Sequence, residues 1–160
     1  MSGGDDVIMS VEGERLLKEE LDQLIKVERE EVKTAIAEAR ALGDLKENAE
    51  YHAAKEKQSL IEGRVLDIQS KLNRAKVVDI SKISTEKIVF GATVALYDHE
   101  KEESFTYQIV GDDESKSSDN KISYRSPLGK ALIGLEVGET VLVKAPKGDL
   151  EYEIEDVSYR

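Results

Sequence analysis

The hydrophobic residues in the first half of the chain recur every three or four positions, which is the spacing of one face of an α-helix. Between residues 10 and 42 this stripe consists of Leu17, Leu21, Leu24, Val32, Ala35, Ala39 and Leu42. Ser10 stands before the stripe as a helix N-cap, and Gly43 follows it where a helix C-terminus favours glycine. A second stripe, from Leu45 to about Ala75, consists of Ala49, Ala53, Leu60, Ile61, Val65, Ile68 and Leu72. Two long helices are therefore expected.

The connection between these helices is so short that they must form an antiparallel hairpin. Each helix has roughly 30 residues and hence a length of about 45 Å. One narrow apolar stripe per helix can bury only against its partner, and the remaining faces are charged, as in "KVEREEVK". The pattern predicts a coiled coil that projects into solvent. The alanines near the turn predict close helix packing and a slim tip.

The second half changes to short segments rich in β-branched and aromatic residues, which are typical of strands. They are "KIVFGATVALYD", "ESFTYQIVG", "NKISYRS", "TVLVKAP" and "LEYEIEDVSY", and "APKGD" predicts a hairpin between the last two. "SPLGKALIGLEVGE" instead predicts a short helix with Ser126 as cap, Pro127 at its first position and Gly134 at its end. The acid-rich "GDDESKSSDN" is expected to be an exposed loop.

These patterns predict an α+β protein: an N-terminal coiled-coil hairpin followed by a small antiparallel sheet with one short helix. The expected division is residues 1–78 for the hairpin, with its tip at about 41–50, residues 79–87 for a linker, and residues 88–160 for the C-terminal domain. Leu128, Leu132 and Ile133 are candidates for the core of that domain.

Composition and charge narrow the function classes. The 160 residues include no cysteine, which excludes disulfides and thiolate metal sites. The net charge of −11 divides into −2 for residues 1–9, −2 for residues 10–76 (15 acids, 13 bases) and −7 for residues 77–160 (17 acids, 10 bases). Such acidity argues against strong binding of free DNA, because phosphate neutralisation needs clustered Lys and Arg. With no signal-peptide pattern and no apolar run of about 20 residues, we expect a soluble, cytoplasmic monomer without membrane contact.

The stretch "ALGDLKENAEYH", residues 41–52, allows two interpretations of its acids. In one, Asp44 caps the second helix and Glu47 lies three residues on, as in a capping box. In the other, the two carboxylates share a divalent cation, since Mg²⁺ usually takes one or two protein carboxylates plus water and phosphate. Such a metal site would be incomplete until a partner supplied the other ligands.

Basic and aromatic residues surround these acids. Arg40, Lys46 and Lys55 could hold a nucleic-acid backbone, or could be ordinary solvated side chains. Tyr51 could stack on a base or pack across the hairpin. Nothing in the sequence orients His52 as a general base.

Four longer stretches carry a resemblance to a known family. "IAEARALGDLKENAEYHAAKEKQSLIEGRVLDIQSKL" resembles the tip signature of the bacterial Gre transcript-cleavage factors, and their GreA branch most of all. "VFGATVAL", "YQIVGDDE" and "ISYRSPLGKALIGLEVGE" resemble the C-terminal half of the same family, so the resemblance covers essentially residues 8–159. It implies an FKBP-like C-terminal domain that binds RNA polymerase and a coiled coil that enters the polymerase's secondary channel. There the factor would stimulate the polymerase's own endonucleolytic cleavage of the 3′ end of backtracked RNA.

The resemblance also implies roles for individual residues. The family's two tip acids fall on Asp44 and Glu47, which would share Mg²⁺ with the polymerase active site, so that the chain activates cleavage and is not itself an enzyme. The family's basic tip positions fall on Arg40 and Lys55, and a lysine at the latter keeps the charge but not a bidentate phosphate grip.

The docking segment implied by the resemblance is the neighbourhood of Ser126 and Pro127. Arg125, just before it, departs from the small polar or acidic residue expected there.

Three other functions remain open at this point. A channel regulator without cleavage activity would share the architecture but alter the tip, whereas Asp44 and Glu47 are both intact. A peptidyl-prolyl isomerase is suggested only by the FKBP-like fold, and fold does not imply function. A coiled-coil adaptor would tolerate substitutions at the tip.

Overall fold

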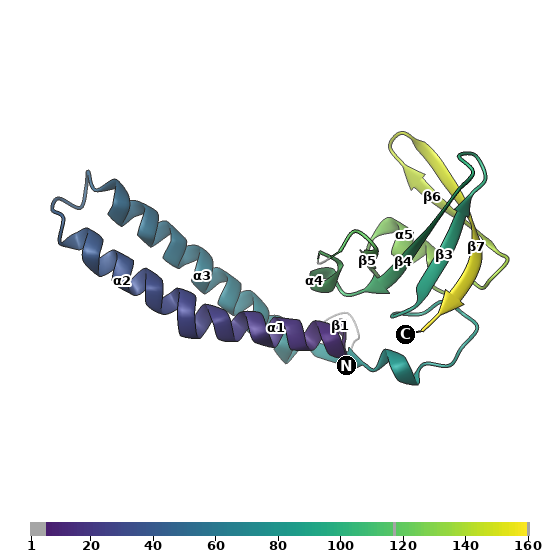
Figure 1. Cartoon of the computed structure of the whole chain (residues 1–160), viewed down its shortest axis with the longest axis horizontal. Coiled ribbons are helices and arrows are strands. Elements are labelled where there is room, and N and C mark those ends of the chain that lie inside the picture. The colour runs from purple at the N-terminus through teal and green to yellow at the C-terminus, as the bar shows by residue number, and fades with distance from the viewer. Residues whose placement is uncertain (1–5, 117, 160) are drawn as a thin grey trace. The chain divides into compact units, whose positions relative to one another are not determined.

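The structure is a computed structural model of the whole chain and describes residues 6–116 and 118–159. It contains two compact units (Figure 1). Residues 15–75 belong to a helical hairpin, whereas residues 6–14 join the chain from residue 76 onward in a unit built on a sheet.

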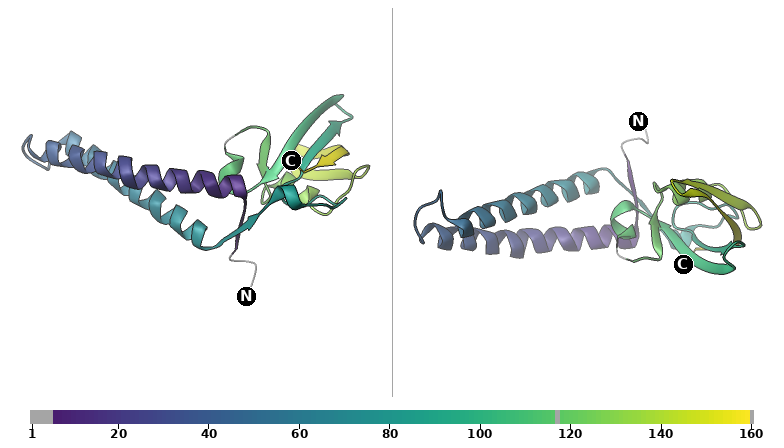
Figure 2. Two further views of the ribbon diagram at one scale, coloured as in Figure 1. Left: turned by 60° about the horizontal axis from the view of Figure 1, so that its bottom comes forward. Right: turned by 90° about the horizontal axis from the view of Figure 1, so that it is seen from above.

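The first arm of the hairpin is helical without a break from Val11 to Arg40. It consists of α1 (Val11–Gln23), a π-helical segment η2 (Leu24–Glu28) and α2 (Arg29–Arg40). The second arm is α3 (Ala49–Asn73), which runs antiparallel to α2 (Figures 1 and 2). The Ser10 hydroxyl accepts a hydrogen bond from the Gly13 N–H at 3.0 Å, which confirms Ser10 as the N-cap of α1.

The hairpin buries one narrow seam. Its buried side chains are Leu17, Leu24, Val32, Ile36 and Ala39 on the first arm and Ile61, Val65 and Ile68 on the second. The spacing of eight between Leu24 and Val32 coincides with η2, where the Arg29 N–H bonds to the Leu24 carbonyl, five residues back. A π turn takes up one residue more than an α turn, so the two stretches of seam keep facing α3.

Of the four predicted seam alanines, Ala39 is buried as predicted and the other three are wrong. The side chains at Ala35, Ala49 and Ala53 are exposed, as are those of Leu42 and Leu60. Ile36 takes the place predicted for Ala35, one step of four from Val32. The turn occupies residues 41–48 and α3 begins only at Ala49, so no close alanine seam forms beside the turn.

Bidentate ion pairs between described residues join the arms. Arg29 donates through Nε and Nη2 to the two oxygens of Glu62, both at 2.8 Å, and Arg64 does the same to Glu20 at 2.7 and 2.8 Å. Such bidentate pairs have a fixed geometry, so they set the register of α3 against the first arm. The hydrogen bond from Arg29 lowers the pKa of Glu62 below its ordinary value.

The second unit contains a five-stranded sheet in the order β5-β4-β3-β7-β6. The strands are β3 (Thr93–Asp98), β4 (Glu103–Val110), β5 (Lys121–Ser123), β6 (Thr140–Ala145) and β7 (Gly148–Ser158). β6 and β7 form the predicted hairpin, with Ala145 opposite Gly148. β5 pairs parallel to β4, so the sheet is mixed and not purely antiparallel as predicted. The helix α4 (Asp112–Ser115), in the connection from β4, brings the chain back in the same direction.

The core of this unit lies between the sheet and the short helix α5 (Pro127–Leu132). Its fully buried members include Ile88, Val94, Leu96, Ile109, Leu132, Val141 and Ile154. Leu132 therefore is a core residue, and Leu128 packs against the core while partly buried. Ile133 is 40% exposed and does not fill the core.

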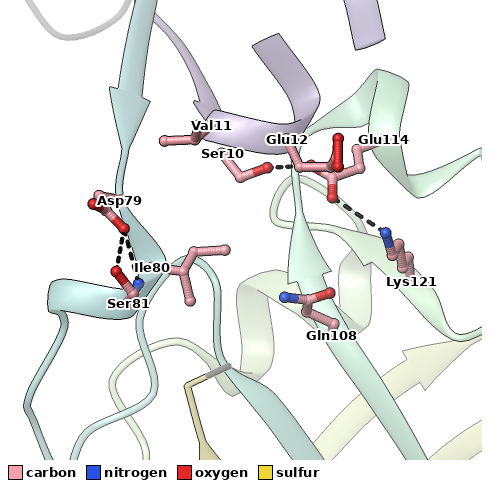
Figure 3. A pocket seen from close by; sticks show the side chains of 9 residues that line it. All are labelled: Ser10, Val11, Glu12, Asp79, Ile80, Ser81, Gln108, Glu114 and Lys121. Carbon is pink, nitrogen blue, oxygen red and sulfur yellow. Dashed lines mark hydrogen bonds and ion pairs between the residues drawn. The ribbon is translucent and has the colours of Figure 1, made fainter. Parts of the chain in front are cut away.

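The start of α1 is anchored on the second unit. Strand β1 (Val7–Ser10) pairs with β2 (Ala75–Val78), a two-stranded sheet that the sequence patterns do not reveal. The Ser10 hydroxyl also donates to the buried carboxylate of Glu114, which pairs with Lys121 Nζ at 3.2 Å (Figure 3). Glu114 lies in α4, so the predicted exposed loop is wrong at this point, because the acid has two close polar partners that offset its burial.

The region between the two predicted domains has regular structure. The predicted linker contains the 3₁₀ turn η3 (Ile80–Lys82), capped by the Asp79 side chain, which accepts from the Ser81 N–H at 3.1 Å. Among the described helices, none is long and apolar enough to cross a membrane.

Candidate functional site at the hairpin turn

The turn between α2 and α3 presents acidic side chains to solvent. Asp44 and Glu47 are both exposed, and with Glu50 they line a shallow hollow of about 360 Å³. Leu42, Asn48 and Ala49 complete its lining. The two sequence-predicted acids therefore lie on one hollow, at the end of the hairpin.

Asp44 and Glu47 do not form the predicted capping box. Asp44 Oδ1 accepts from the backbone N–H of Lys46 at 3.0 Å, which folds residues 44–46 into an Asx-type turn. Gly43, at φ +130°, supplies a backbone conformation that other residues rarely adopt. Residues 45–48 therefore lie in the turn and not in the second helix, where the sequence pattern predicts them. The cap of α3 is Asn48, whose Oδ1 accepts from the Tyr51 N–H at 3.0 Å.

Both carboxylates keep capacity for further ligands. Glu47 makes no side-chain hydrogen bond or ion pair with any residue that the structure describes. Asp44 uses one oxygen for Lys46, and a carboxylate has about four acceptor sites. Both acids lie on the turn and not along a helix, and both side chains are exposed to solvent.

The predicted basic residues surround the same turn. Arg40 ends α2 and its guanidinium lies 5.8 Å from the centre of the Tyr51 ring. Tyr51 is half-buried, so it packs across the hairpin, as one of the two interpretations of this residue proposed. Lys46 is exposed, and Lys55 Nζ donates only to Gln58, at 3.3 Å, among the described residues.

His52 has an orienting contact that the sequence did not suggest. Its Nε2 lies 3.2 Å from the carbonyl oxygen of Lys46, so the ring spans the turn. Its edge also faces the ring of Tyr51, with the centres 5.6 Å apart. These contacts are explained by support of the turn, and they engage the nitrogen that a general base would use.

The residues of the turn fit part of a metal shell. Asp44 and Glu47 offer the oxygen donors that Mg²⁺ prefers. Within residues 6–116 and 118–159 no three Asp, Glu, His or Cys side chains are arranged so that they could hold a metal ion, so these acids could hold a hard cation only jointly with other donors.

The docking residues implied by the resemblance, Arg125, Ser126 and Pro127, lie together in the second unit at the start of α5. The Ser126 hydroxyl accepts from the Gly129 N–H at 3.1 Å and donates to the Ser123 carbonyl at 2.7 Å, which confirms the predicted cap. Arg125 is exposed and donates through Nε to the Tyr124 hydroxyl at 3.1 Å. This hydrogen bond raises the pKa of Arg125, which keeps its positive charge on the surface of the segment.

A second hollow, of about 340 Å³, lies beside β1 in the sheet unit (Figure 3). Its acids already have partners: Glu114 bonds to Ser10 and Lys121, and Asp79 bonds to Ser81. The hydroxyl of Ser81 lowers the pKa of Asp79. The contacts of Glu114 are explained by the anchoring of the start of α1, and that of Asp79 by the capping of η3, so the hairpin turn is the stronger candidate.

A helical hairpin with carboxylates and bases on its exposed turn, followed in the chain by a sheet unit, is the architecture that the resemblance to the Gre factors implies. Comparison with known families agrees: the N-terminal domain of transcription elongation factors matches residues 7–77, and the C-terminal domain of the transcription elongation factors GreA/GreB matches residues 83–159. The chain belongs to the GreA/GreB family of transcription elongation factors.

Individual relatives are similar over nearly their whole length. The transcription elongation factor GreA of Thermodesulfovibrio yellowstonii is 56% identical over 97% of this chain and 98% of its own. GreA of Pseudomonas aeruginosa is 51% identical over 94% of this chain and 96% of its own. The crystal structure of GreA factor homolog 1 from Thermus thermophilus matches at 28% identity and a TM-score of 0.44, over 96% of this chain and 99% of that one.

Proposed function

We propose that this transcription elongation factor binds RNA polymerase and stimulates the polymerase's intrinsic cleavage of the 3′ end of backtracked RNA. The observation that carries the proposal is the exposed pair Asp44 and Glu47, with free acceptor capacity, on the turn of a chain that belongs to this family. Rescue of arrested complexes would follow, because cleavage creates a new RNA 3′ end at the active site.

The two units would divide the work. The segment Arg125, Ser126 and Pro127 would dock on the polymerase, where a preformed cap and an exposed cation present a rigid surface. The hairpin would enter the secondary channel, with the seam and the two bidentate ion pairs keeping its arms in register. Both functions reside in one chain, so a single copy in the cytoplasm suffices.

At the active site, Asp44 and Glu47 would hold a Mg²⁺ ion jointly with the polymerase. When bound, such a second ion neutralises charge on the transferred phosphate and lowers the pKa of its water. Arg40, Lys46 and Lys55 would bind phosphates of the extruded RNA and keep its backbone in place. Lys55 would act as a point charge, since an ammonium group cannot grip a phosphate as the planar guanidinium does.

This division explains why the chain would be an activator and not a nuclease. Two carboxylates are too few to hold a hard cation tightly, because the remaining sites would be filled only by water. The free chain would therefore not cleave RNA, and activity would require the polymerase's own ligands.

The test uses a defined backtracked elongation complex with 3′-labelled RNA. Asp44→Asn and Glu47→Gln should each reduce stimulated cleavage by a factor of roughly 10² or more, in line with loss of a positioned catalytic ligand. Their affinity for polymerase should be unchanged, because docking involves the other unit. Glu56→Gln, an exposed acid on α3 away from the turn, is the matched control and should cleave as the wild type does.

Two outcomes would overturn the proposal. Cleavage at the wild-type rate with either tip variant would remove the carboxylates from the mechanism. A wild-type protein that binds the complex and slows transcription without shortening the RNA would instead be a channel regulator.

A further inference from the structure

Asn48 connects the two arms of the hairpin through a single side chain. Its Oδ1 accepts from the Tyr51 N–H at 3.0 Å and caps α3. Its Nδ2 donates to the carbonyl oxygen of Ala39, in the last turn of α2, at 2.6 Å. The amide is part-buried, so these bonds form where water competes less for the donor and acceptor.

The acceptor on α2 is itself well anchored. The Ala39 side chain is only 3% exposed and belongs to the hairpin seam. Its carbonyl also accepts from the Leu42 N–H at 3.1 Å, so both of its lone pairs are used. A bond to this oxygen therefore ties Asn48 to the packed part of the hairpin and not to the exposed turn.

We propose that Asn48 is a positioning residue for the carboxylates of Asp44 and Glu47. This inference rests on the proposed function of the turn. Glu47 is the residue directly before Asn48. The Asn48 side chain bonds to both arms, so the chain beside Glu47 is fixed at that point. Nearer the middle of the turn, the Asx bond of Asp44 and the contact of His52 with the Lys46 carbonyl hold the remaining residues.

The physical reason for such a device lies in the placement of the acids. Side chains on a turn have more conformational freedom than those on a helix, and a catalytic group must be held within about 0.5 Å of its productive position. A displacement of about 1 Å can lower a rate by a factor of 10². Asn48 closes the turn on both sides and so limits that freedom before the polymerase is met.

The chemistry of asparagine separates this role from capping. Asn, Asp and Ser are all good N-caps, since each offers an oxygen to the first turn of a helix. Among these three only asparagine also carries an N–H donor that can reach across to α2. Asn48→Asp and Asn48→Ser should therefore keep the cap of α3 and lose the bond to Ala39.

The experiment measures stimulated RNA cleavage against factor concentration for Asn48→Ser and Asn48→Asp, with Asn73→Ser at the other end of α3 as the matched control. We expect both variants at position 48 to keep the wild-type helix content and the wild-type concentration for half-maximal effect. Their maximal cleavage rate should fall by about 10-fold to 100-fold. The Asn73→Ser protein should behave as the wild type in all three measurements.

A second measurement uses the free protein. In NMR spectra, the Asn48 side-chain amide should show one proton shifted downfield and protected from solvent exchange, unlike that of the exposed Asn73. Equal exchange at the two amides would overturn the proposed bond, whatever the cleavage rates.

The cleavage outcomes separate this inference from the function on which it rests. If the tip-acid variants lose activity while Asn48→Ser and Asn48→Asp reach the wild-type maximal rate, the positioning role is wrong and the proposed function stands. If loss of activity in the position-48 variants follows loss of helix content, Asn48 is only a cap. If Asp44→Asn and Glu47→Gln are fully active, the proposed function itself fails.

Discussion

Gly129 in α5 offers a test of how tightly the segment proposed for docking, residues 125–127, packs against its surroundings. A Cβ atom at this position would lie 2.3 Å from the carbonyl oxygen of Ser123, well inside van der Waals contact, and 3.1 Å from Ser126 Oγ. The Ser123 oxygen accepts from both the N–H and the hydroxyl of Ser126. Gly129→Ala must therefore push the backbone of the segment apart and disturb the cap of α5.

The expected cost combines three effects. Overpacking against a backbone atom costs about 1–3 kcal/mol. Disturbing a helix cap costs about 1 kcal/mol, and the better helix propensity of alanine returns about 1 kcal/mol. The free energy of unfolding of the sheet unit should thus fall by about 1–3 kcal/mol.

Gly63→Ala is the matched control for this substitution. Gly63 lies within α3 with open space around its Cα, so an added methyl group meets nothing within 4 Å. This variant should stabilise the hairpin by about 0.5–1 kcal/mol through helix propensity alone.

Urea unfolding distinguishes the two variants because the probes differ. Tyrosine fluorescence reports mostly on the sheet unit, which contains all the tyrosines but Tyr51, and circular dichroism at the helix band reports mostly on the hairpin. Gly129→Ala should lower the midpoint of the fluorescence transition and weaken binding to RNA polymerase. An unchanged midpoint for Gly129→Ala would refute the tight contact with Ser123.

Three further substitutions test the packing and the ionic contacts of the two units. Ile68 is fully buried in the seam, so Ile68→Ala should cost about 2–5 kcal/mol, read from the helical transition in urea, and a smaller loss would show that the seam can collapse around the cavity. Arg29 lowers the pKa of Glu62, so the stabilisation that the ionised Glu62 gives the fold is present above its ordinary pKa and is lost as the pH falls through the folded value. The melting temperature of Glu62→Gln should therefore depend less on pH between about pH 3 and 6 than that of the wild type. An identical pH profile would contradict the ion pair. Burial raises the pKa of Tyr152, so the free energy of unfolding falls as the pH rises from the ordinary tyrosine pKa through the folded value. In Tyr152→Phe the loss of stability between about pH 9 and 12 should be smaller than in the wild type. An equal loss in both proteins would argue against burial as the cause.

The sequence predicts that two long helices pack along one apolar seam, but it does not predict all the residues that form the seam beyond the π turn. Leu17, Leu24, Val32, Ile61 and Val65 follow from three-and-four spacing alone. The gap of eight before Val32 was visible as an irregularity, but periodicity cannot tell a π turn from a break in the seam. The same limit explains why Ala35 was predicted in place of Ile36.

At the turn, the sequence placed the acids together and misassigned the cap. Both Asp44 and Asn48 are residues that favour N-caps, and a short acidic stretch offers several consistent starts for a helix. The choice depends on the Asx turn and on the bond from Asn48 to Ala39, nine residues away, which no local pattern reveals. The spacing of Asp44 and Glu47 fits both a capping box and a shared cation, and the family resemblance is what favours the metal-binding role.

In the sheet unit, the sequence predicts where the strands of the five-stranded sheet lie, but for most of them not which strands pair with one another. The parallel pairing of β5 with β4 depends on α4, whose sequence resembles a polar loop because Glu114 is acidic. The burial of that glutamate is offset by Lys121 nearby and by Ser10, more than 100 residues earlier, which donates a hydrogen bond to it. Contacts of this range are the part of a fold that single-sequence patterns lack.

The π turn Leu24–Glu28 affects how the first arm of the hairpin can accommodate the loss of a residue. If one residue were deleted there, the wider turn could become an ordinary α turn, and the spacing from Leu24 to the next seam residue would return to seven. The seam on both sides would still face α3, and the end of the arm would stay nearly in place, because the wider turn absorbs the extra residue without adding a further turn. The π turn thus lets the first arm accommodate a change of one residue in its sequence without turning its acidic end to a new direction.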